Sequence, residues 1–89
     1  MNFCILYGKI ISNMEFEFLY NSKKHVSVLT FKLLPEQQME GNEKCKDFII
    51  VKAYDEVADM IYQKVKQFDY IYIEGKLTSK FVEASFFTV

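Results

Sequence analysis

The chain of 89 residues has no tryptophan or arginine, a single proline and three glycines. So little glycine and proline excludes a fibrous or disordered chain and favours a tightly connected fold. The length predicts one domain, residues 1–89, because a second domain would leave neither half enough interior to be stable. Hydrophobic residues make up 51% of the chain and aromatic residues 17%, enough for a compact core without disulfide or metal staples.

The chain also lacks an excess of charge of either sign. Its eleven basic residues, all lysines, stand against twelve acidic ones, so the formal net charge is −1. Nucleic-acid-binding domains often carry a clear basic excess, because phosphate neutralisation dominates their affinity. A nucleic-acid function therefore requires that the lysines gather on one surface and the acids on another.

Cysteine is scarce as well, and Cys4 and Cys45 match no metal-ligand spacing. Cys4 lies in an apolar run and is expected to be buried, whereas Cys45 lies between two lysines and is expected in an exposed loop. A disulfide between them is the less favoured alternative. No signal-peptide pattern opens the chain, and no apolar run approaches the roughly 18–20 residues of a membrane span. We expect a reducing compartment and neither a metal nor a cofactor.

Apolar and polar residues alternate in several segments, which predicts strands. The predicted strands are Phe3 to Ile11, His25 to Leu34, Phe48 to Tyr54, Tyr70 to Thr78 and Ala84 to Val89. A helix is predicted from Glu56 to Gln67, with Asp55 as its N-cap. Its apolar stripe, expected in the core, consists of Val57, Ile61, Val65 and Phe68.

Three strands, a helix and two strands, in that order, predict an all-β OB fold. This fold is a five-stranded antiparallel Greek-key barrel, here with one helix between strands three and four, and its strand 2–3 face binds oligonucleotides. Gly8 supports a barrel, since a glycine inside a strand often marks a bulge or a sharp bend. Small α+β sheets share the same order of elements.

The outward side of the third predicted strand is the candidate binding surface. The period of two in a strand places Phe48, Lys52 and Tyr54 on one side, and Lys32 should lie beside them on the second strand. Rings stack on bases for about 1–3 kcal/mol each while ammonium groups follow the phosphates, which suits single-stranded nucleic acid. Exposed aromatics on a sheet are also typical of an oligomer interface or of plain β-propensity.

A catalytic site is not predicted. No nucleophile, base and orienting acid stand at a suitable spacing, and the chain has no glycine-rich phosphate loop. The lone His25 is expected to pack at the protein surface or in a turn rather than to bind a ligand. Tyr70 and Tyr72 can pack under the helix or a loop instead of joining the binding surface.

Three segments carry a family pattern in one order and spacing over nearly the whole chain. They are NFCILYGKI from Asn2 to Ile10, the stretch from Asp47 through Ala58, and YIEGKL from Tyr72 to Leu77. Together they resemble the bacterial-type single-stranded DNA-binding protein family. The resemblance implies an OB fold and sequence-tolerant binding of single-stranded DNA in replication and repair. It also implies a homo-oligomer, a dimer or tetramer, formed through the outer face of the first strand (Phe3, Ile5, Tyr7).

The resemblance assigns further roles to individual residues. It implies base-stacking aromatics at Phe48 and Tyr54 and another at about Phe81. It implies polar or basic positions near the bound strand at or beside Lys9, Lys52 and Lys76. With Lys32, these are the candidate nucleic-acid-binding residues.

The chain departs from the family pattern in ways that predict weaker binding. Gln37 stands where the family has an aromatic residue, and Glu17 where a basic residue is usual. The family's linker and acidic tail do not follow the last predicted strand, and the hairpin around Val82 and Glu83 is short. These departures leave open an alternative, an OB-fold protein-interaction subunit of a larger assembly. The lysine-only, Phe-, Ile- and Tyr-rich composition suggests an AT-rich genome, so a plastid or the bacterial cytoplasm is expected.

Overall fold

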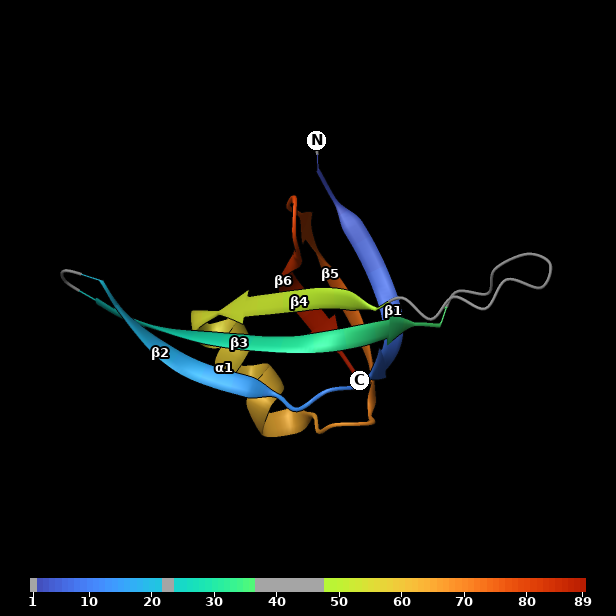
Figure 1. The fold of residues 1–89 in the computed structure, drawn as a ribbon, viewed down its shortest axis with the longest axis horizontal. Helices are drawn as coiled ribbons and strands as arrows, with labels where there is room; N and C mark the ends of the chain where they lie inside the picture. The colour runs from blue at the N-terminus through green and yellow to red at the C-terminus, as the bar shows by residue number, and fades with distance from the viewer. Residues whose placement is uncertain (1, 22–23, 37–47) are drawn as a thin grey trace.

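The computed structural model describes residues 2–21, 24–36 and 48–89. Six strands and one helix lie in these residues (Figure 1). In chain order they are β1 (Cys4–Ile10), β2 (Glu15–Asn21), β3 (Lys24–Pro35), β4 (Ile49–Tyr54), α1 (Asp55–Lys64), β5 (Tyr70–Leu77) and β6 (Val82–Thr88).

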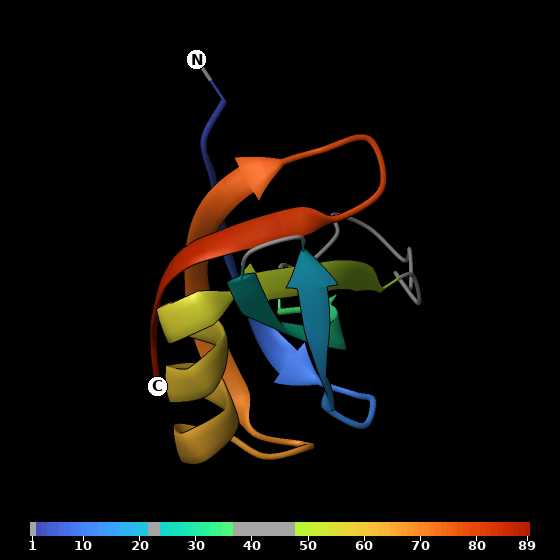
Figure 2. The same cartoon turned by 90° about the vertical axis from the view of Figure 1, so that its left-hand side faces the viewer.

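Five of the strands close into a barrel, seen from one end in Figure 2. β3 pairs with β1 and β4, β4 with β6, β6 with β5, and β5 with β1. The β4–β6 pair is parallel and the other four pairs are antiparallel. The predicted OB fold, a barrel with one helix between its third and fourth strands, is confirmed.

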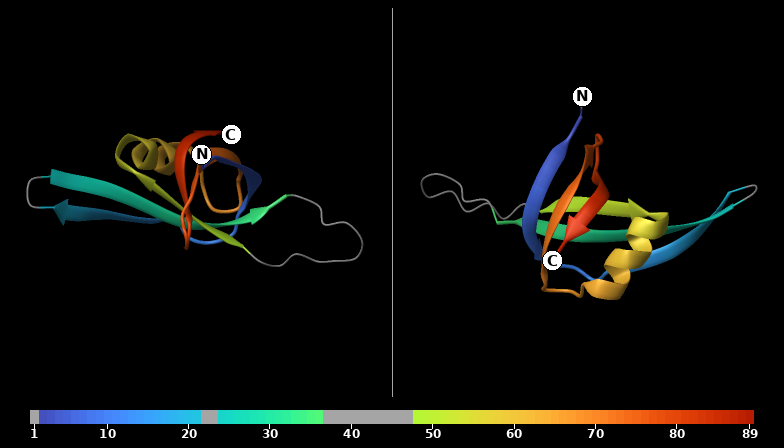
Figure 3. Two further views of the ribbon diagram at one scale, coloured as in Figure 1. Left: turned by 90° about the horizontal axis from the view of Figure 1, so that it is seen from above. Right: turned by 180° about the vertical axis from the view of Figure 1, so that it is seen from behind.

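The remaining strand, β2, is an element that the sequence pattern did not predict. It pairs with β3 along its whole length, with Glu15 opposite Thr30, and the two strands form a long hairpin that extends beyond the barrel (Figures 1 and 3). Phe16 packs against the core, and its ring stacks on Tyr62 of α1 at 4.5 Å between centroids. The alternating acids and aromatics of this segment therefore mark a strand with one side toward the helix.

The core lies inside the barrel and under α1. The inward sides of β3 and β4 form part of it, because Leu29, Phe31 and Leu33 are buried opposite Ala53, Val51 and the half-buried Ile49. The remaining buried core residues are Ile10, Ala58, Ile61, Val65, Ile71, Ile73 and Ala84. Burial of these apolar side chains is the main force that holds the barrel closed.

Two glycines allow the backbone to pass close to itself where the barrel closes. Gly8 pairs with β5 on one edge and with Pro35 on the other, and a Cβ here would fall on the carbonyl oxygen of Leu34. Gly75 lies at a register shift between β5 and β6, and its Cβ would fall on the carbonyl oxygen of Glu83. Any larger residue would push the paired strands apart at these two points.

The helix differs from its prediction at both ends. Tyr54 occupies the N-cap position without a side-chain cap hydrogen bond, so the expected cap by Asp55 is wrong; Asp55 itself has a φ of 55°. The helix ends at Lys64, because Val65 is already extended with a φ of −129°. The helical spacing is lost there, so Phe68 leaves the apolar stripe and is 61% exposed rather than part of the core.

Several smaller features can also be compared with the sequence. Leu77 is 57% exposed at the end of β5. Cys4 is half-buried and free, while Cys45 and Gln37 lie outside the described residues. No helix in the described ranges is long and apolar enough to cross a membrane.

Candidate nucleic-acid interface

The outer surface of β3, β4 and the start of β6 brings together five of the predicted site residues. We call this surface the outer face; it holds Phe48, Lys52, Tyr54, Lys32 and Phe81. The register of β3 and β4 sets Thr30 opposite Lys52. The next pair along, Phe31 opposite Val51, is buried, so the side chains of Thr30 and Lys52 point outward.

Each lysine of the outer face lies against one aromatic ring. The Lys32 ammonium is 4.7 Å from the centroid of Phe48, whose side chain is 43% exposed. The Lys52 ammonium is 5.5 Å from the centroid of Phe81 and donates a hydrogen bond to Thr30 Oγ1 at 3.1 Å. Such contacts are cation–π interactions, and they hold ring and cation side by side.

A tight turn between β5 and β6 positions Phe81. The Thr78 hydroxyl donates to the carbonyl oxygen of Phe81 at 2.7 Å and accepts from its N–H at 3.0 Å. The Thr78 N–H donates to the same carbonyl at 2.8 Å. Thr78 thus bonds to both the N–H and the carbonyl of Phe81, which closes the turn. The Phe81 ring therefore has a defined place beside Lys52.

A carboxylate lies within the outer face. Glu83 stands opposite Lys52 across β4–β6 and opposite Lys76 across β5–β6. This acid therefore separates Lys76 from Lys52 and the rest of the outer face. Burial raises the pKa of Tyr54, and the charge of Glu83 raises it further. The face is therefore a mixture of rings, two lysines and one acid rather than a uniformly basic patch.

A groove of about 420 Å³ runs beside Lys32. Its β3–β4 wall includes Thr30 and Ile50, and its other wall includes Ser12 and Glu15. Ser12 Oγ accepts a hydrogen bond from the Lys32 N–H at 2.9 Å, which fixes the loop before β2 against β3. The outer face is thus bordered by a groove whose lining includes an acidic residue.

Lys9 lies on β1, around the barrel from the other predicted lysines. It stands opposite Tyr70 on β5 and Leu34 on β3, and its ammonium is 5.8 Å from the centroid of Phe68. Sequence reasoning missed Phe68 as a surface residue, because the helical spacing of apolar residues runs on into it. The end of the helix carries no glycine or proline that would have marked the break.

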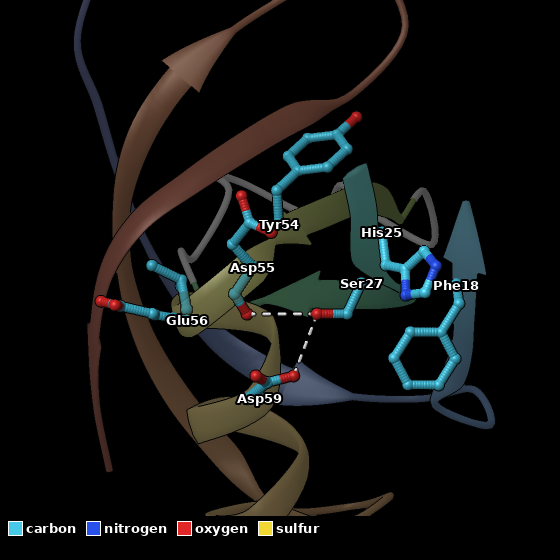
Figure 4. A pocket seen from close by; sticks show the side chains of 8 residues that line it. Phe18, His25, Ser27, Tyr54, Asp55, Glu56 and Asp59 are labelled. Atoms are coloured by element: carbon cyan, nitrogen blue, oxygen red, sulfur yellow. Dashed lines mark hydrogen bonds between the residues drawn. The ribbon is translucent and has the colours of Figure 1, made fainter. Parts of the chain in front are cut away.

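A second and larger groove lies on the other side of the β2–β3 hairpin, facing α1 (Figure 4). We call it the helix-side groove; its volume is about 690 Å³. It is lined by Phe18, His25, Ser27, Tyr54, Asp55, Glu56, Val57 and Asp59. The buried Ser27 hydroxyl donates to Asp59 Oδ1 at 3.0 Å and is 3.5 Å from the carbonyl oxygen of Asp55.

His25 lies exposed in this groove, as predicted for a surface residue, with its ring edge-on to Tyr20 at 4.5 Å. The charged groups that line the groove beside it are carboxylates. In the described part of the chain no three His, Cys, Asp or Glu side chains gather as they would around a metal ion.

The outer surface of β1 and β5 exposes several apolar and aromatic side chains. Phe3, Ile5 and Tyr7 are 58%, 54% and 50% exposed. The amide of Asn2 donates to the carbonyl of Leu77 at 2.6 Å and accepts from its N–H at 3.0 Å, so the asparagine of the first family segment fixes the chain start to the end of β5.

The two β5 tyrosines lie on this outer surface. Tyr70 stacks on Tyr7 at 5.7 Å between centroids. Tyr72 stands opposite Tyr7 and donates to Glu74 Oε2 at 2.7 Å. This hydrogen bond raises the pKa of Tyr72, and desolvation and the Glu74 charge add to the effect. Both rings face outward beside β1, not under the helix.

Solved structures of bacterial single-stranded DNA-binding proteins share this fold. One is a deletion mutant of the single-stranded DNA binding protein from Thermus aquaticus, with 21% identity and a TM-score of 0.78 over 99% of this chain. The chain spans 40% of that protein. The SSB domain of a protein from Synechococcus sp. has 13% identity and a TM-score of 0.69, with coverage of 98% of this chain and 93% of that one.

The second single-stranded DNA-binding protein of Mycobacterium smegmatis has 15% identity and a TM-score of 0.68, with coverage of 99% and 84%. A search of curated proteins found no match. The model of the family described as "Single-strand binding protein family" matches residues 1–85. This match confirms the resemblance seen in three sequence segments and, since this is a family of binding proteins, the prediction that the chain is not an enzyme. The chain belongs to the Single-strand binding protein family.

Proposed function

We propose that this protein binds single-stranded DNA without sequence specificity on the outer face. Bases stack on Phe48, Tyr54 and Phe81, while Lys32 and Lys52 neutralise phosphates. The observation that carries the proposal is the pairing of ring and cation, with ammonium groups 4.7 and 5.5 Å from the centroids of Phe48 and Phe81. Family membership and the bacterial single-stranded DNA-binding proteins of the same fold support this class of ligand.

The spacing of these groups suits a single strand. Each nucleotide offers one flat base and one phosphate, so a surface that repeats ring and cation can hold successive nucleotides without reading their edges. Phe48 and Tyr54 are six residues apart on one side of the strand, about 20 Å in extended backbone. Duplex DNA hides its base faces, so stacking on these rings selects for single strands.

The electrostatics set a modest affinity. Glu83 stands between Lys52 and Lys76, and Glu15 lines the groove beside Lys32. Phosphates near these carboxylates are repelled, which offsets part of the gain from the lysines. Lys76 contributes at the margin of the face beyond Glu83, whereas Lys9 lies on β1, around the barrel from it.

Assembly of several copies would give a longer binding surface. The exposed Phe3, Ile5 and Tyr7 on the outer side of β1 support the predicted homo-oligomer, a dimer or tetramer, since contiguous apolar patches of this kind mark association sites. Roles in replication and repair and a plastid setting remain predictions from the sequence.

A second candidate function is protein binding. The helix-side groove has exposed aromatic residues, with Phe18 at 60%, and it carries carboxylates in place of lysines. An OB domain that contacts a protein partner through this groove would account for the near-neutral net charge of −1.

The test compares oligo-dT with duplex DNA at two salt concentrations. The Phe48→Ala/Tyr54→Ala double variant should lose about 100-fold in affinity for oligo-dT, because each lost stack is worth about 1–3 kcal/mol. The matched control is Phe18→Ala/Tyr20→Ala, which removes two exposed rings from the β2–β3 hairpin and should bind as wild type does. Absence of wild-type binding at low salt, or equal losses in both double variants, rules out the proposal.

A further inference from the structure

The ring of Phe68 is exposed to solvent, and the backbone at this residue has an unfavourable conformation. Its φ of 78° lies in the left-handed region, which is unfavourable for a bulky side chain and easy for glycine or asparagine. The ring is nevertheless 61% exposed, so core packing does not explain why phenylalanine stands there. Strained residues of this kind gather at functional sites, which makes the ring a candidate for ligand contact.

The turn around Phe68 is fixed from both sides. The Phe68 N–H donates to the Ile10 carbonyl at 2.7 Å, and the Ile10 N–H donates to the Asp69 carbonyl at 2.9 Å. Asp69 Oδ2 also accepts from the Lys66 N–H at 2.9 Å. These bonds tie the turn to the end of β1, so the ring is presented from a rigid support.

The surroundings of the ring repeat the chemistry of the outer face. The Lys9 ammonium lies 5.8 Å from the centroid of Phe68, as Lys32 and Lys52 lie against Phe48 and Phe81. An exposed ring beside a cation fits a base with its phosphate. A purely apolar partner surface would gain nothing from an ammonium group held over the ring.

The Lys9–Phe68 pair lies close to the Lys32–Phe48 pair around the barrel. Lys9 stands opposite Leu34 on β3, and the pair Leu33–Ile49 places Phe48 on the far side of the same strand. Neighbouring strands lie about 4.8 Å apart, so the backbones of Lys9 and Phe48 are roughly 10 Å from each other. One or two nucleotides can cover such a distance.

We propose that single-stranded DNA leaving the outer face at Phe48 crosses β3 over Leu34 and stacks a further base on Phe68. Lys9 holds a phosphate of the same segment. This inference rests on the proposed function and extends the binding path from three strands of the barrel onto β1 and the turn before β5.

The experiment measures affinity for oligo-dT of two lengths, about four and about 12 nucleotides, within the range that one OB fold covers. Phe68→Gly and Phe68→Asn remove the ring and suit the left-handed backbone, so both variants should fold. Both should bind the longer oligonucleotide about tenfold more weakly than wild type does and the shorter one equally well. Phe68→Tyr keeps a flat ring and should retain the tight binding of the longer oligonucleotide.

Lys9→Gln should weaken binding of the longer oligonucleotide and reduce its log–log salt slope by about 0.7, the value for one phosphate contact with a single strand. Lys64→Gln, the same charge change on α1, should leave this slope unchanged. The inference is wrong if the Phe68 variants bind the longer oligonucleotide as wild type does, or if they alter only the oligomeric mass. If wild type binds neither length, the proposed function itself fails, which is a different result from loss of the length dependence alone.

Discussion

The outer face and the helix-side groove both expose aromatic rings beside charged groups, and they differ in the sign of the charge. On the outer face, Lys32 and Lys52 lie against Phe48 and Phe81. In the groove, Phe18 and His25 face carboxylates at the start of α1 (Figure 4). An exposed ring alone is therefore not a sign of nucleic-acid binding; the neighbouring charge decides which ligand the ring can take.

The fold itself explains the charges of the groove. Asp55 and Glu56 lie in the first turn of α1, where the helix dipole favours negative charge, and Asp59 accepts a hydrogen bond from buried Ser27. On the outer face, the Lys32 ammonium lies over the ring of the exposed Phe48. An exposed ring beside a cation fits a nucleotide, which offers a base and a phosphate.

The largest expected effect comes from giving the outer face the charge of the groove. Lys32→Glu/Lys52→Glu should weaken oligo-dT binding by about 100-fold or more at low salt, because two phosphate contacts become two repulsions. Fluorescence anisotropy at two salt concentrations measures the change, and Lys64→Glu on α1 is the control for a charge reversal away from the outer face. Equal losses in the double variant and the control would remove the distinction between the two regions.

Asp59 tests whether the acids of the groove serve the fold. Asp59→Ala should lower the free energy of unfolding by about 1 kcal/mol, because the buried hydroxyl of Ser27 loses its acceptor. Asp59→Asn keeps an oxygen at that position and should retain most of the stability. Urea unfolding measures both variants. A clear change in oligo-dT affinity in either variant would contradict a purely structural role.

Glu83 is, among the described residues, an acid of the outer face that resembles those of the groove. Glu83→Gln should strengthen oligo-dT binding by about threefold at low salt, since the carboxylate opposite Lys52 no longer repels phosphates. The gain should shrink at high salt as the charge is screened. Unchanged or weaker binding at low salt would show that the strand does not pass near this side chain.

The smallest expected effect concerns Tyr54, which belongs to the outer face and also lines the groove. Burial and Glu83 raise its pKa above the ordinary value of 10.0, so the folded state favours the neutral phenol. The resulting stability is fully present below pH 10 and is lost as the pH rises through the higher folded pKa. Wild type should therefore lose stability relative to Tyr54→Phe above that pH in urea unfolding. An equal pH dependence in the two proteins would contradict the assignment.

Much of the barrel could be predicted from the sequence, because the buried strands alternate cleanly. Lys52 between Phe48 and Tyr54 is an outward set that a period of two identifies, and the structure brings Lys32 beside it. The register between strands, which sets Glu83 against Lys52, depends on pairing between distant segments and is invisible in a local pattern.

The sequence pattern missed the strand β2 and the exposed position of Phe68, each for a physical reason. β2 has apolar residues on the side toward the helix and acids on the other, but it is not one of the five barrel strands, and its place depends on the packing of Phe16 against Tyr62. Phe68 continues the spacing of the helix after the helix has ended, and its left-handed φ is held by hydrogen bonds to Ile10 and the turn. Such tertiary constraints override a periodic pattern.

A single introduced tryptophan tests the central claim most directly, because the chain has none of its own. Phe48→Trp places the probe on the outer face, and Phe18→Trp places it in the helix-side groove at a comparably exposed position. On titration with oligo-dT, stacking should quench the fluorescence of Trp at the first position and leave the second unchanged. Quenching at the groove position, with none on the outer face, would contradict the account.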